Sequence, residues 1–395
     1  MSFYLNALGI INSLGDNQKD VLGRILNGSP NGLVASRGYI ENETVFVGVV
    51  SYPLPEVPKS LSKLNCRNNQ LLLSAYNQIK DDIQEAIDEY GLDRVAVIIG
   101  SSTSGIAEGE VAIKEKLDTG KWPVEFDYKQ QEVGTPSLFL KSYLKLTGLH
   151  YTISTACSSS ARVFKSARNL LQMGVCDAVI VGGADSLCKL TVRGFNSLEA
   201  ISLNKTNPMS LNRDGINIGE GAALFLMTKE SSENAWEFLG YGDSSDAHHI
   251  SAPEPEGLGA EIAIKNSLLD AKLSSDDMTY VNLHGTGTEL NDIMEAKSFR
   301  RIFNDKMPCS SIKPMIGHTL GASGAIELAV CCMLISNLNQ HNKLPPHLWD
   351  NERDEKIPEL NLVKNNFRYQ NNEKHYIMSN SFAFGGNNCS IIIGK

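Results

Sequence analysis

Cys157 is the residue of this sequence best placed to act as a nucleophile. It lies in the segment STACSSSA (154–161), between the strand-like HYTIS and a stretch whose apolar residues have helical spacing. We therefore expect Cys157 at or near a helix N-terminus, where the macrodipole and free backbone N–H groups stabilise an anion and lower the pKa of a thiol. Its own N–H could also stabilise an oxyanion. A buried structural cysteine is the alternative interpretation.

Two histidines accompany glycine-containing turns later in the chain. His284 ends the strand-like run YVNLH, and His318 precedes a helix that opens with small residues. The carboxyl ends of strands are where α/β folds place ligands. A lone histidine is more often structural, and a cysteine hydrolase would normally pair one His with an Asn or Asp. One Cys with two His indicates nucleophilic catalysis without a metal. Both histidines could donate hydrogen bonds to one developing enolate oxygen, as a decarboxylating condensation requires.

Further polar and aromatic residues stand close to these histidines in the sequence. Thr286 and Thr288 in the turn GTGTEL could be turn formers, or could hydrogen-bond an amide-bearing ligand arm. Lys313 and Glu327 could form a buried ion pair, which is often purely architectural. The segment NSFAFGGNN (380–388) is a glycine-containing turn ahead of the last strand, and an ordinary hairpin with core aromatics is its alternative interpretation.

The elements that position these residues alternate between apolar strand-like runs and amphipathic helical stretches, the pattern of a layered α/β fold. Runs rich in Val, Ile and Leu predict buried strands at Arg94–Gly100, Asp177–Gly183, Ala222–Thr228 and Tyr280–His284. A weak internal repeat pairs three segments in the same order, 95–105 with 280–290, 154–174 with 317–337 and 219–229 with 385–395. We therefore predict a duplicated α/β unit, with one half at 1–235 carrying the cysteine and the other at 236–395 carrying both histidines.

The composition excludes several classes of protein. The chain has 395 residues, 42% of them hydrophobic, and a net charge of −9. That length fits two domain-sized halves, and the negative charge argues against a nucleic-acid binder. No run approaches the ~20 apolar residues of a membrane span, and the N-terminus lacks the basic region of a signal peptide. We expect a soluble, cytoplasmic protein whose eight cysteines form no C-x-x-C motif.

Taken together, these segments resemble the β-ketoacyl-acyl carrier protein synthases, the elongating condensing enzymes of the thiolase superfamily, over essentially the whole chain. The family pattern of a nucleophilic Cys, a His in an H-G-T turn and Lys-x-x-x-x-His falls on Cys157, His284 and the pair Lys313 and His318. The resemblance implies the thiolase fold, with two pseudo-symmetric α/β halves in a five-layered αβαβα arrangement.

The resemblance also implies a role for each matched residue. Cys157 would take an acyl chain from an acyl carrier protein, and His284 and His318 would stabilise the enolate formed when malonyl-carrier protein loses carbon dioxide. Backbone N–H groups of Cys157 and Phe384 would form the oxyanion hole, and the Phe384 ring would act as a gate. Lys313, Glu327 and Asp292 would support the active site. Thr286 and Thr288 would contact the pantetheine arm. No metal and no redox cofactor would be needed.

The chain departs from fatty-acid elongators at a few of these positions. Glu289 and Asn291 stand where Pro and Gly are usual, and Ala383 and Asn387 where Gly and Thr are usual. Other stretches resemble the ketosynthases of bacterial aryl polyene pathways, which would imply a conjugated acyl chain with an aryl head. These stretches are 67–73, 194–202 and 242–257. A general fatty-acid elongator is the alternative.

The resemblance implies protein partners as well. The synthase would dimerise, either with a second copy or with a chain-length-factor-like subunit. The chain could itself be such a non-catalytic subunit, but these lack the nucleophile, and Cys157 is present. An acidic carrier protein needs local positive charge on an acidic chain, for which the candidates are Lys59, Lys63, Arg67 and Lys205.

Overall fold

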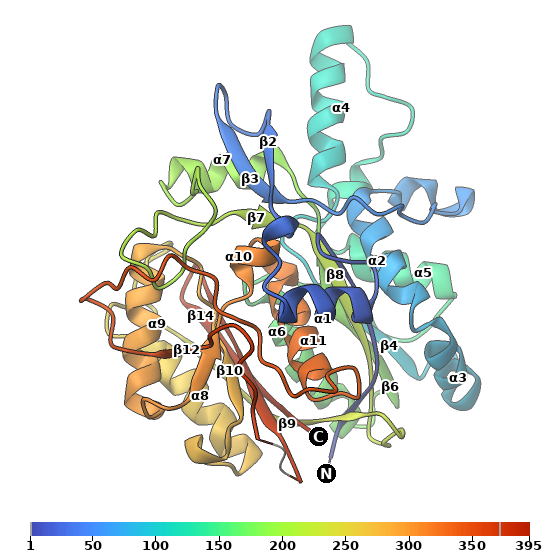
Figure 1. Ribbon diagram of the computed structural model, residues 1–395. Coiled ribbons are helices and arrows are strands. Elements are labelled where there is room, and N and C mark those ends of the chain that lie inside the picture. Colours follow the sequence, from blue (N-terminus) through green and yellow to red (C-terminus); the bar gives the residue numbers. More distant parts are fainter. Residues whose placement is uncertain (1, 371–372) are drawn as a thin grey trace.

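The first half of the chain forms a mixed β-sheet. The computed structural model describes residues 2–370 and 373–395, and Figure 1 shows its two α/β parts side by side. Strands of the first part follow the spatial order β1-β8-β6-β4-β5. Their bounds are β1 (Tyr4–Asn12), β4 (Val95–Gly100), β5 (His150–Ile153), β6 (Ala178–Asp185) and β8 (Gly221–Thr228). Strand β4 is parallel to β5 and β6, whereas β8 is antiparallel to β6 and β1.

The second half repeats this topology. Its strands follow the order β9-β14-β13-β10-β11-β12. Their bounds are β9 (Trp236–Ser245), β10 (Tyr280–Asn282), β11 (Pro308–Ser310), β12 (Asn361–Leu362), β13 (Tyr376–Ala383) and β14 (Asn387–Gly394). Strand β10 is parallel to β11 and β13, and β14 is antiparallel to β13 and β9. Strands β1, β8, β6, β4 and β5 therefore correspond to β9, β14, β13, β10 and β11.

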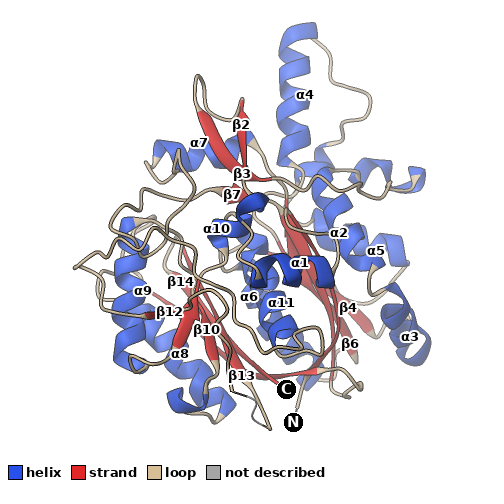
Figure 2. Ribbon diagram, in the orientation of Figure 1, coloured by secondary structure: helices blue, strands red, loops and turns tan. Residues whose placement is uncertain are grey.

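Helices complete five layers. In the centre, α6 (Ser159–Gln172) packs on α11 (Ser323–Leu334), with one half-sheet on each side. The outer helices of the first half are α2 (Arg67–Asn77), α3 (Lys80–Tyr90) and α5 (Thr135–Leu144), and those of the second half are α8 (Leu258–Ala271) and α9 (Glu289–Ile302). Figure 2 shows the same αβαβα order of helices and strands. The predicted pseudo-symmetric arrangement is thus confirmed.

The two half-sheets are joined at one edge. Tyr4 and Leu5 of β1 pair with Glu237 and Trp236 of β9, so the strands described form one continuous 11-stranded sheet. No motif or periodicity in the sequence predicts this connection. No helix in the described part of the chain is long and apolar enough to cross a membrane.

Several smaller elements stand outside the layers. A three-stranded sheet of β2 (Val34–Arg37), β3 (Thr44–Gly48) and β7 (Ile218–Gly219) lies beside α7 (Lys189–Ser197). Helices α1 (Gln18–Leu26) and α10 (Lys313–Ile316) lie near the centre of the view in Figure 1. Helix α4 (Ile106–Thr119) projects from the body of the molecule.

The predicted strands agree with the fold to within two residues at each end, the repeats fall on equivalent elements, and one detail places a histidine outside its predicted strand. Every residue of β4, β6 and β8 is buried, as expected for short runs of Val, Ile and Leu covered on both faces. The three repeated segment pairs fall on β4 and β10, on α6 and α11, and on β8 and β14. The detail concerns His284, because β10 ends at Asn282 and the histidine lies in the turn that follows.

Candidate active site

The nucleophile candidate sits in a sharp turn between β5 and α6. Cys157 is 5% exposed, and the residue before it, Ala156, has a φ of +51°. A left-handed backbone is uncommon for a residue with a Cβ, and such strain tends to be kept at functional sites. The turn is held locally, because the N–H of Thr155 donates to Ser159 Oγ at 2.8 Å. This geometry directs the thiol toward the second half of the molecule.

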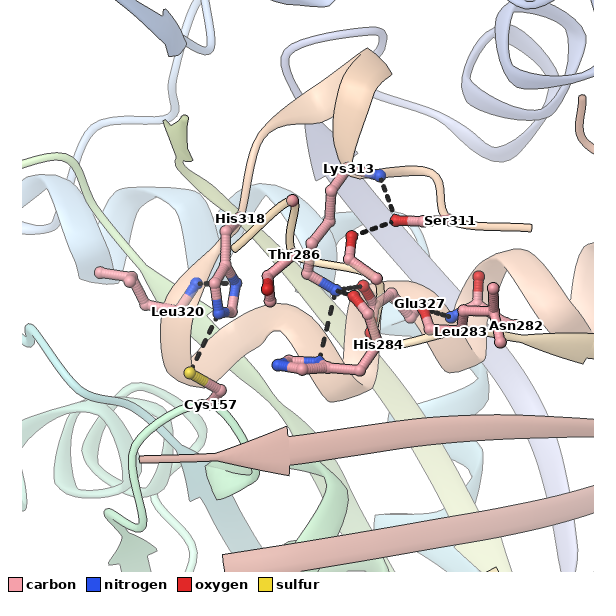
Figure 3. A network of polar contacts seen from close by, with 12 residues as sticks. Cys157, Asn282, Leu283, His284, Thr286, Ser311, Lys313, His318, Leu320 and Glu327 are labelled. Carbon is pink, nitrogen blue, oxygen red and sulfur yellow. Dashed lines mark hydrogen bonds and ion pairs between the residues drawn. The ribbon is translucent and has the colours of Figure 1, made fainter. Parts of the chain in front are cut away.

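His318 contacts the thiol directly. Its Nε2 lies 3.0 Å from Cys157 Sγ, and a dashed line marks this contact in Figure 3. The other ring nitrogen, Nδ1, accepts the backbone N–H of Leu320 at 3.2 Å. A neutral imidazole has one donor and one acceptor nitrogen, so Nε2 carries the proton. His318 therefore presents an N–H toward the sulfur.

His284 is oriented in the same way by a buried cation. The Nζ of Lys313 lies 3.5 Å from His284 Nδ1 and also donates to the His284 carbonyl and to Glu327 (Figure 3). An ammonium group has donors only, so Nδ1 of His284 acts as the acceptor and its Nε2 carries the proton. The two imidazole rings are 5.4 Å apart between centroids. Two Nε2–H donors thus converge beside Cys157.

Burial determines the charge states of these groups. It lowers the pKa of both His284 and His318 well below the usual value, and the Lys313 ammonium adds to the effect. Both rings are therefore neutral near pH 7. Burial also raises the pKa of the Cys157 thiol to about 11, although Lys313 and the backbone N–H groups of Phe384 and Cys157 act in the opposite direction. The sequence-based expectation of a lowered pKa for this thiol was wrong, because desolvation exceeds these stabilising contributions.

Two buried carboxylates hold the turn that carries His284. Glu295 accepts the N–H groups of His284 and Gly285, each at 2.7 Å. Asp292 accepts those of Gly287 at 3.2 Å and Met209 at 2.8 Å. Asp292 was predicted as a support and lies behind the turn, away from the reactive atoms. Glu295 was missed, although two acidic residues three apart on a helix share one face, and that spacing was the available signal.

A cavity of about 530 Å³ leads to these groups. Its lining includes Cys157, both histidines, Thr286, Thr288 and Phe384. The hydroxyls of Thr286 and Thr288 lie 2.9 Å apart. Three of the residues predicted for the site do not line this cavity, namely Lys313, Glu327 and Asp292. Lys313 contacts His284 from behind and pairs with Glu327. The sequence-predicted nucleophile, histidines, threonines and gate residue therefore meet around one open volume.

Two domains of one protein family match this chain. The β-ketoacyl synthase N-terminal domain matches residues 63–232, and the C-terminal domain of the same family matches residues 236–348. Together they cover more than half of the chain. This chain is a β-ketoacyl synthase. It belongs to the ketosynthase condensing enzymes, as the motifs suggested.

Individual relatives extend this result over the full length. The 3-oxoacyl-(acyl-carrier-protein) synthase 2 of Staphylococcus aureus is 31% identical over 347 residues, covering 83% of this chain and 82% of the relative. A putative mitochondrial 3-oxoacyl-(acyl-carrier-protein) synthase of Schizosaccharomyces pombe is 31% identical over 428 residues, covering 99% and 98%.

Solved structures give the same fold. The ketosynthase ApeO, in complex with its chain length factor ApeC from Xenorhabdus doucetiae, superposes with a TM-score of 0.93 and 43% identity over 100% of this chain and 98% of that one. The ishigamide ketosynthase/chain length factor matches with a TM-score of 0.86 and 26% identity, covering 100% and 99%. The thiolase fold predicted from the sequence is therefore confirmed.

The gate segment of the synthase lies in the β13–β14 hairpin. Ala383 ends β13 and pairs with Asn387 of β14, while Gly385 and Gly386 have φ values of +80° and +72°. Phe384 stands between this strand and the left-handed glycines. Its ring packs against Phe195 of α7 at 5.3 Å between centroids. Phe195 falls in the stretch 194–202 that resembles aryl polyene ketosynthases, but no pattern in that stretch indicates its contact with the gate residue.

A metal centre is the other chemistry that the Cys157, His284 and His318 cluster could support in the synthase. Their ligand atoms lie within 4.8 Å of one another, and a thiolate with two imidazoles is a donor set that zinc accepts. A metal-binding histidine usually donates its other ring N–H to a carboxylate, carbonyl or water. Here the other nitrogens face donors instead, namely Lys313 and the N–H of Leu320. These contacts favour two neutral imidazoles that donate through Nε2.

Proposed function

We propose that the first half-reaction of this synthase is acyl transfer from an acyl carrier protein to Cys157. The sulfur attacks the thioester carbonyl, the bond to the carrier's pantetheine sulfur breaks, and the proton of the cysteine thiol leaves with the released carrier thiol. The N–H groups of Cys157 and Phe384 hold the oxyanion of the tetrahedral intermediate. These two N–H groups stabilise the Cys157 thiolate and lower the pKa of the thiol, whereas burial raises it. Their position beside the sulfur supports this assignment.

In the second half-reaction, malonyl-carrier protein loses carbon dioxide and its electron pair forms an enolate. His284 and His318 each donate an Nε2–H to the enolate oxygen, and the carbanion attacks the Cys157 thioester to release the free Cys157 sulfur. The observation that carries this proposal is that both Nδ1 atoms face donors, at 3.5 Å from Lys313 Nζ and 3.2 Å from Leu320 N. Neither step calls for a metal or a redox cofactor.

The pathway we propose is aryl polyene synthesis, in which the acyl chain is conjugated and carries an aryl head. The stretches 67–73, 194–202 and 242–257 resemble aryl polyene ketosynthases, and identity to the ketosynthase ApeO is 43% over the whole chain. The 3-oxoacyl-(acyl-carrier-protein) synthase 2 of Staphylococcus aureus is less similar, at 31%. The balance of identity therefore favours the specialised pathway over general fatty-acid elongation.

We propose a chain-length-factor-like subunit as the partner of the synthase. The ketosynthase ApeO and the ishigamide ketosynthase are both described with a chain length factor. In this chain, β5 is the edge strand of the large sheet, and such edges are available for pairing with another chain. The projecting α4 and the loop after it expose large apolar side chains, which mark an interaction surface, including Val111, Leu117, Trp122, Val124 and Tyr128.

An acyl carrier protein is the second proposed partner. Of the basic residues suggested for its docking, Lys59 and Lys63 are exposed. Arg67 is committed within the fold, since its Nε donates to Glu220 at 2.8 Å and its Nη2 to the Val50 carbonyl at 2.8 Å. Lys205 is engaged with the Pro30 carbonyl at 2.8 Å. Lys59 and Lys63 are therefore the better candidates of the four.

We also propose that the synthase works in the cytoplasm. Its eight cysteines are all free thiols in the structure, which is the state that a reducing compartment maintains.

Intact-mass analysis of the synthase with a panel of acyl carrier proteins tests this function. Acylation should appear as a mass increase on Cys157, and addition of malonyl-carrier protein should then release carbon dioxide and a β-ketoacyl carrier. An aryl-headed polyene acyl chain should load faster than a saturated chain of equal length. Equal loading would favour the fatty-acid elongator, and carbon dioxide release that stops after chelator treatment would contradict the metal-free mechanism.

A further inference from the structure

Asn291 lies in the wall of the active-site cavity. Fatty-acid elongators usually have glycine at this position. Asn291 lies in the first turn of α9, lines the same 530 Å³ cavity as Thr286 and Thr288, and is 9% exposed. An amide group that is nine-tenths buried needs hydrogen-bond partners on both of its ends. The contacts of its two ends therefore indicate what it can bind.

The orientation of the Asn291 amide is fixed by its neighbour. Its Nδ2 donates to Asp292 Oδ1 at 3.2 Å. Asp292 also accepts the N–H groups of Gly287 and Met209, one on each oxygen, so both carboxylate oxygens act as acceptors. The NH₂ end of Asn291 must face that carboxylate. Its carbonyl oxygen, Oδ1, is then the end left to accept a hydrogen bond from a molecule in the cavity.

The threonine pair beside it offers the opposite function. The Thr288 N–H points to Thr286 Oγ1 at 3.4 Å, and the two hydroxyls are 2.9 Å apart. One hydroxyl donates to the other, which leaves the second hydroxyl hydrogen free for a ligand. The wall of the cavity thus pairs an acceptor, Asn291 Oδ1, with a donor from Thr286 or Thr288. A trans secondary amide points its N–H and its C=O in opposite directions, so an amide that lies between Asn291 and the threonine pair would meet both groups.

We propose that Asn291 is a specificity-determining residue that accepts the N–H of one secondary amide of the carrier's pantetheine arm, while a hydroxyl of Thr286 or Thr288 donates to the carbonyl of the same amide. This inference rests on the proposed function, because it takes the pantetheine thioester as the ligand. It extends that function by giving this chain a polar contact that a glycine at 291 would lack. Asn291 acts in binding the arm and takes no part in the transfer of protons or acyl groups.

The test compares malonyl-pantetheine with two analogues in which each amide in turn is replaced by an ester. An ester keeps the carbonyl but puts an oxygen where Asn291 Oδ1 meets an N–H, so a hydrogen bond becomes a contact between two acceptors. With the wild-type synthase, in the assembly in which it is isolated, one of the two analogues should lower kcat/KM for decarboxylation about tenfold. With Asn291→Leu, the same replacement should cost less than twofold.

Two further variants separate binding from folding. Leucine has nearly the shape of asparagine and a high helix propensity, so Asn291→Leu should keep α9 and the melting temperature. Asn291→Gly, the residue usual in the resembling elongators, should show the same loss of discrimination. Asn234→Leu, at an exposed asparagine before β9, should discriminate as the wild type does.

An equal ester penalty in wild type and Asn291→Leu would overturn the inference and leave the proposed function standing. So would the absence of any penalty at either amide of the wild-type substrate. If the wild type releases no carbon dioxide even from malonyl-carrier protein, the proposed function falls and this inference falls with it.

Discussion

The loops after β4 and β10 occupy equivalent positions in the two halves but do different work. In the first half, Ser101 and Thr103 donate to the buried carboxylate of Asp185. In the second half, the loop is held in the same manner by Glu295, but it presents His284 to the cavity. The same device, a strand-end loop bound to a buried carboxylate, serves as scaffold in one copy and as active-site support in the other.

The central helices show the same division. The turn before α6 carries Cys157, and the segment before α11 carries His318. These helices approach closely, since a Cβ at Gly324 would lie 2.7 Å from the backbone N of Ala161. The N–H of Ala325 also donates to Ser160 Oγ at 2.9 Å. Tight packing of α6 against α11 thus fixes the distance between Cys157 and His318. We infer that the first half supplies the nucleophile of acyl transfer and the second half supplies the hydrogen-bond donors of decarboxylation.

The largest effect should follow from removing the nucleophile of the first half. Cys157→Ala should abolish acylation and condensation, because no other group forms the thioester. Intact mass after incubation with an acyl carrier protein measures this. Cys176→Ala, which removes another buried cysteine at the start of the β6 region, should acylate normally. A mass shift on the Cys157→Ala protein would show that the nucleophile has been assigned to the wrong half.

The second half should be separable from the first. His284→Ala and His318→Ala should each slow malonyl decarboxylation by about 100- to 1,000-fold, the cost of losing one donor to an oxyanion. Acylation of Cys157 should persist in both, and should suffer more in His318→Ala because only His318 lies 3.0 Å from the sulfur. Radiolabelled carbon dioxide release and intact mass measure the two steps. Unimpaired carbon dioxide release by either variant would remove that histidine from the second step.

Much of the duplicated fold and of the active site could be predicted from the sequence. Strong local signals, such as the buried runs that became β4 and β8, predicted the duplicated fold. Glycine-flanked histidines predicted the site, and the structure brings Cys157, His284 and His318 together. These signals depend on short segments whose residue types determine local structure directly.

The remaining features depend on contacts between segments far apart in the chain. The joining of β1 to β9 rests on two residue pairs that no pattern marks. Burial of Cys157 comes from the packing of both halves and outweighs the local effect of a helix start on its pKa. The commitment of Arg67 to Glu220, 153 residues away, likewise could not be read from the basic character of its segment.

The reactivity of Cys157 and the rate of malonyl decarboxylation should depend differently on pH. The pKa of Cys157 is raised to about 11 by burial, so its thiolate fraction grows with pH across the range from 6.5 to 9.5. Alkylation of Cys157 by iodoacetamide should therefore rise about tenfold per pH unit, without the plateau near pH 9 of an ordinary thiol. Mass-resolved labelling rates would show this, and a plateau below pH 9 would contradict the raised pKa.

Decarboxylation should be insensitive to pH over that range. His284 and His318 have pKa values well below the usual one. Both stay neutral above pH 6.5 and keep the Nε2–H that they donate. The rate of carbon dioxide release from malonyl-carrier protein should therefore change less than twofold between pH 6.5 and 9. A drop as pH rises through 6.5 would instead mean that a protonated imidazolium is required.

The smallest effect concerns Phe384, the residue that couples the two halves. Its backbone N–H acts on the Cys157 sulfur of the first half, while its ring rests on Phe195 at 5.3 Å. Glycine tolerates the left-handed backbone at 385 and 386, whereas Ala383 is paired within β13. Motion of the ring should therefore hinge on the glycine side. Phe384→Ala keeps the N–H and removes only the ring.

We expect Phe384→Ala to load acyl groups onto Cys157 a few-fold faster, because the ring is then absent from the cavity that leads to the thiol. Malonyl decarboxylation should then lose its dependence on prior acylation, so that uncoupled carbon dioxide release rises a few-fold relative to condensation. Phe195→Leu, which removes the resting surface but keeps the ring, should shift the ratio in the same direction by less. Both rates are measured on one preparation of each variant. If Phe384→Ala leaves the ratio and the loading rate unchanged, the ring is a fixed part of the hairpin, and the two half-reactions are ordered by something other than this segment.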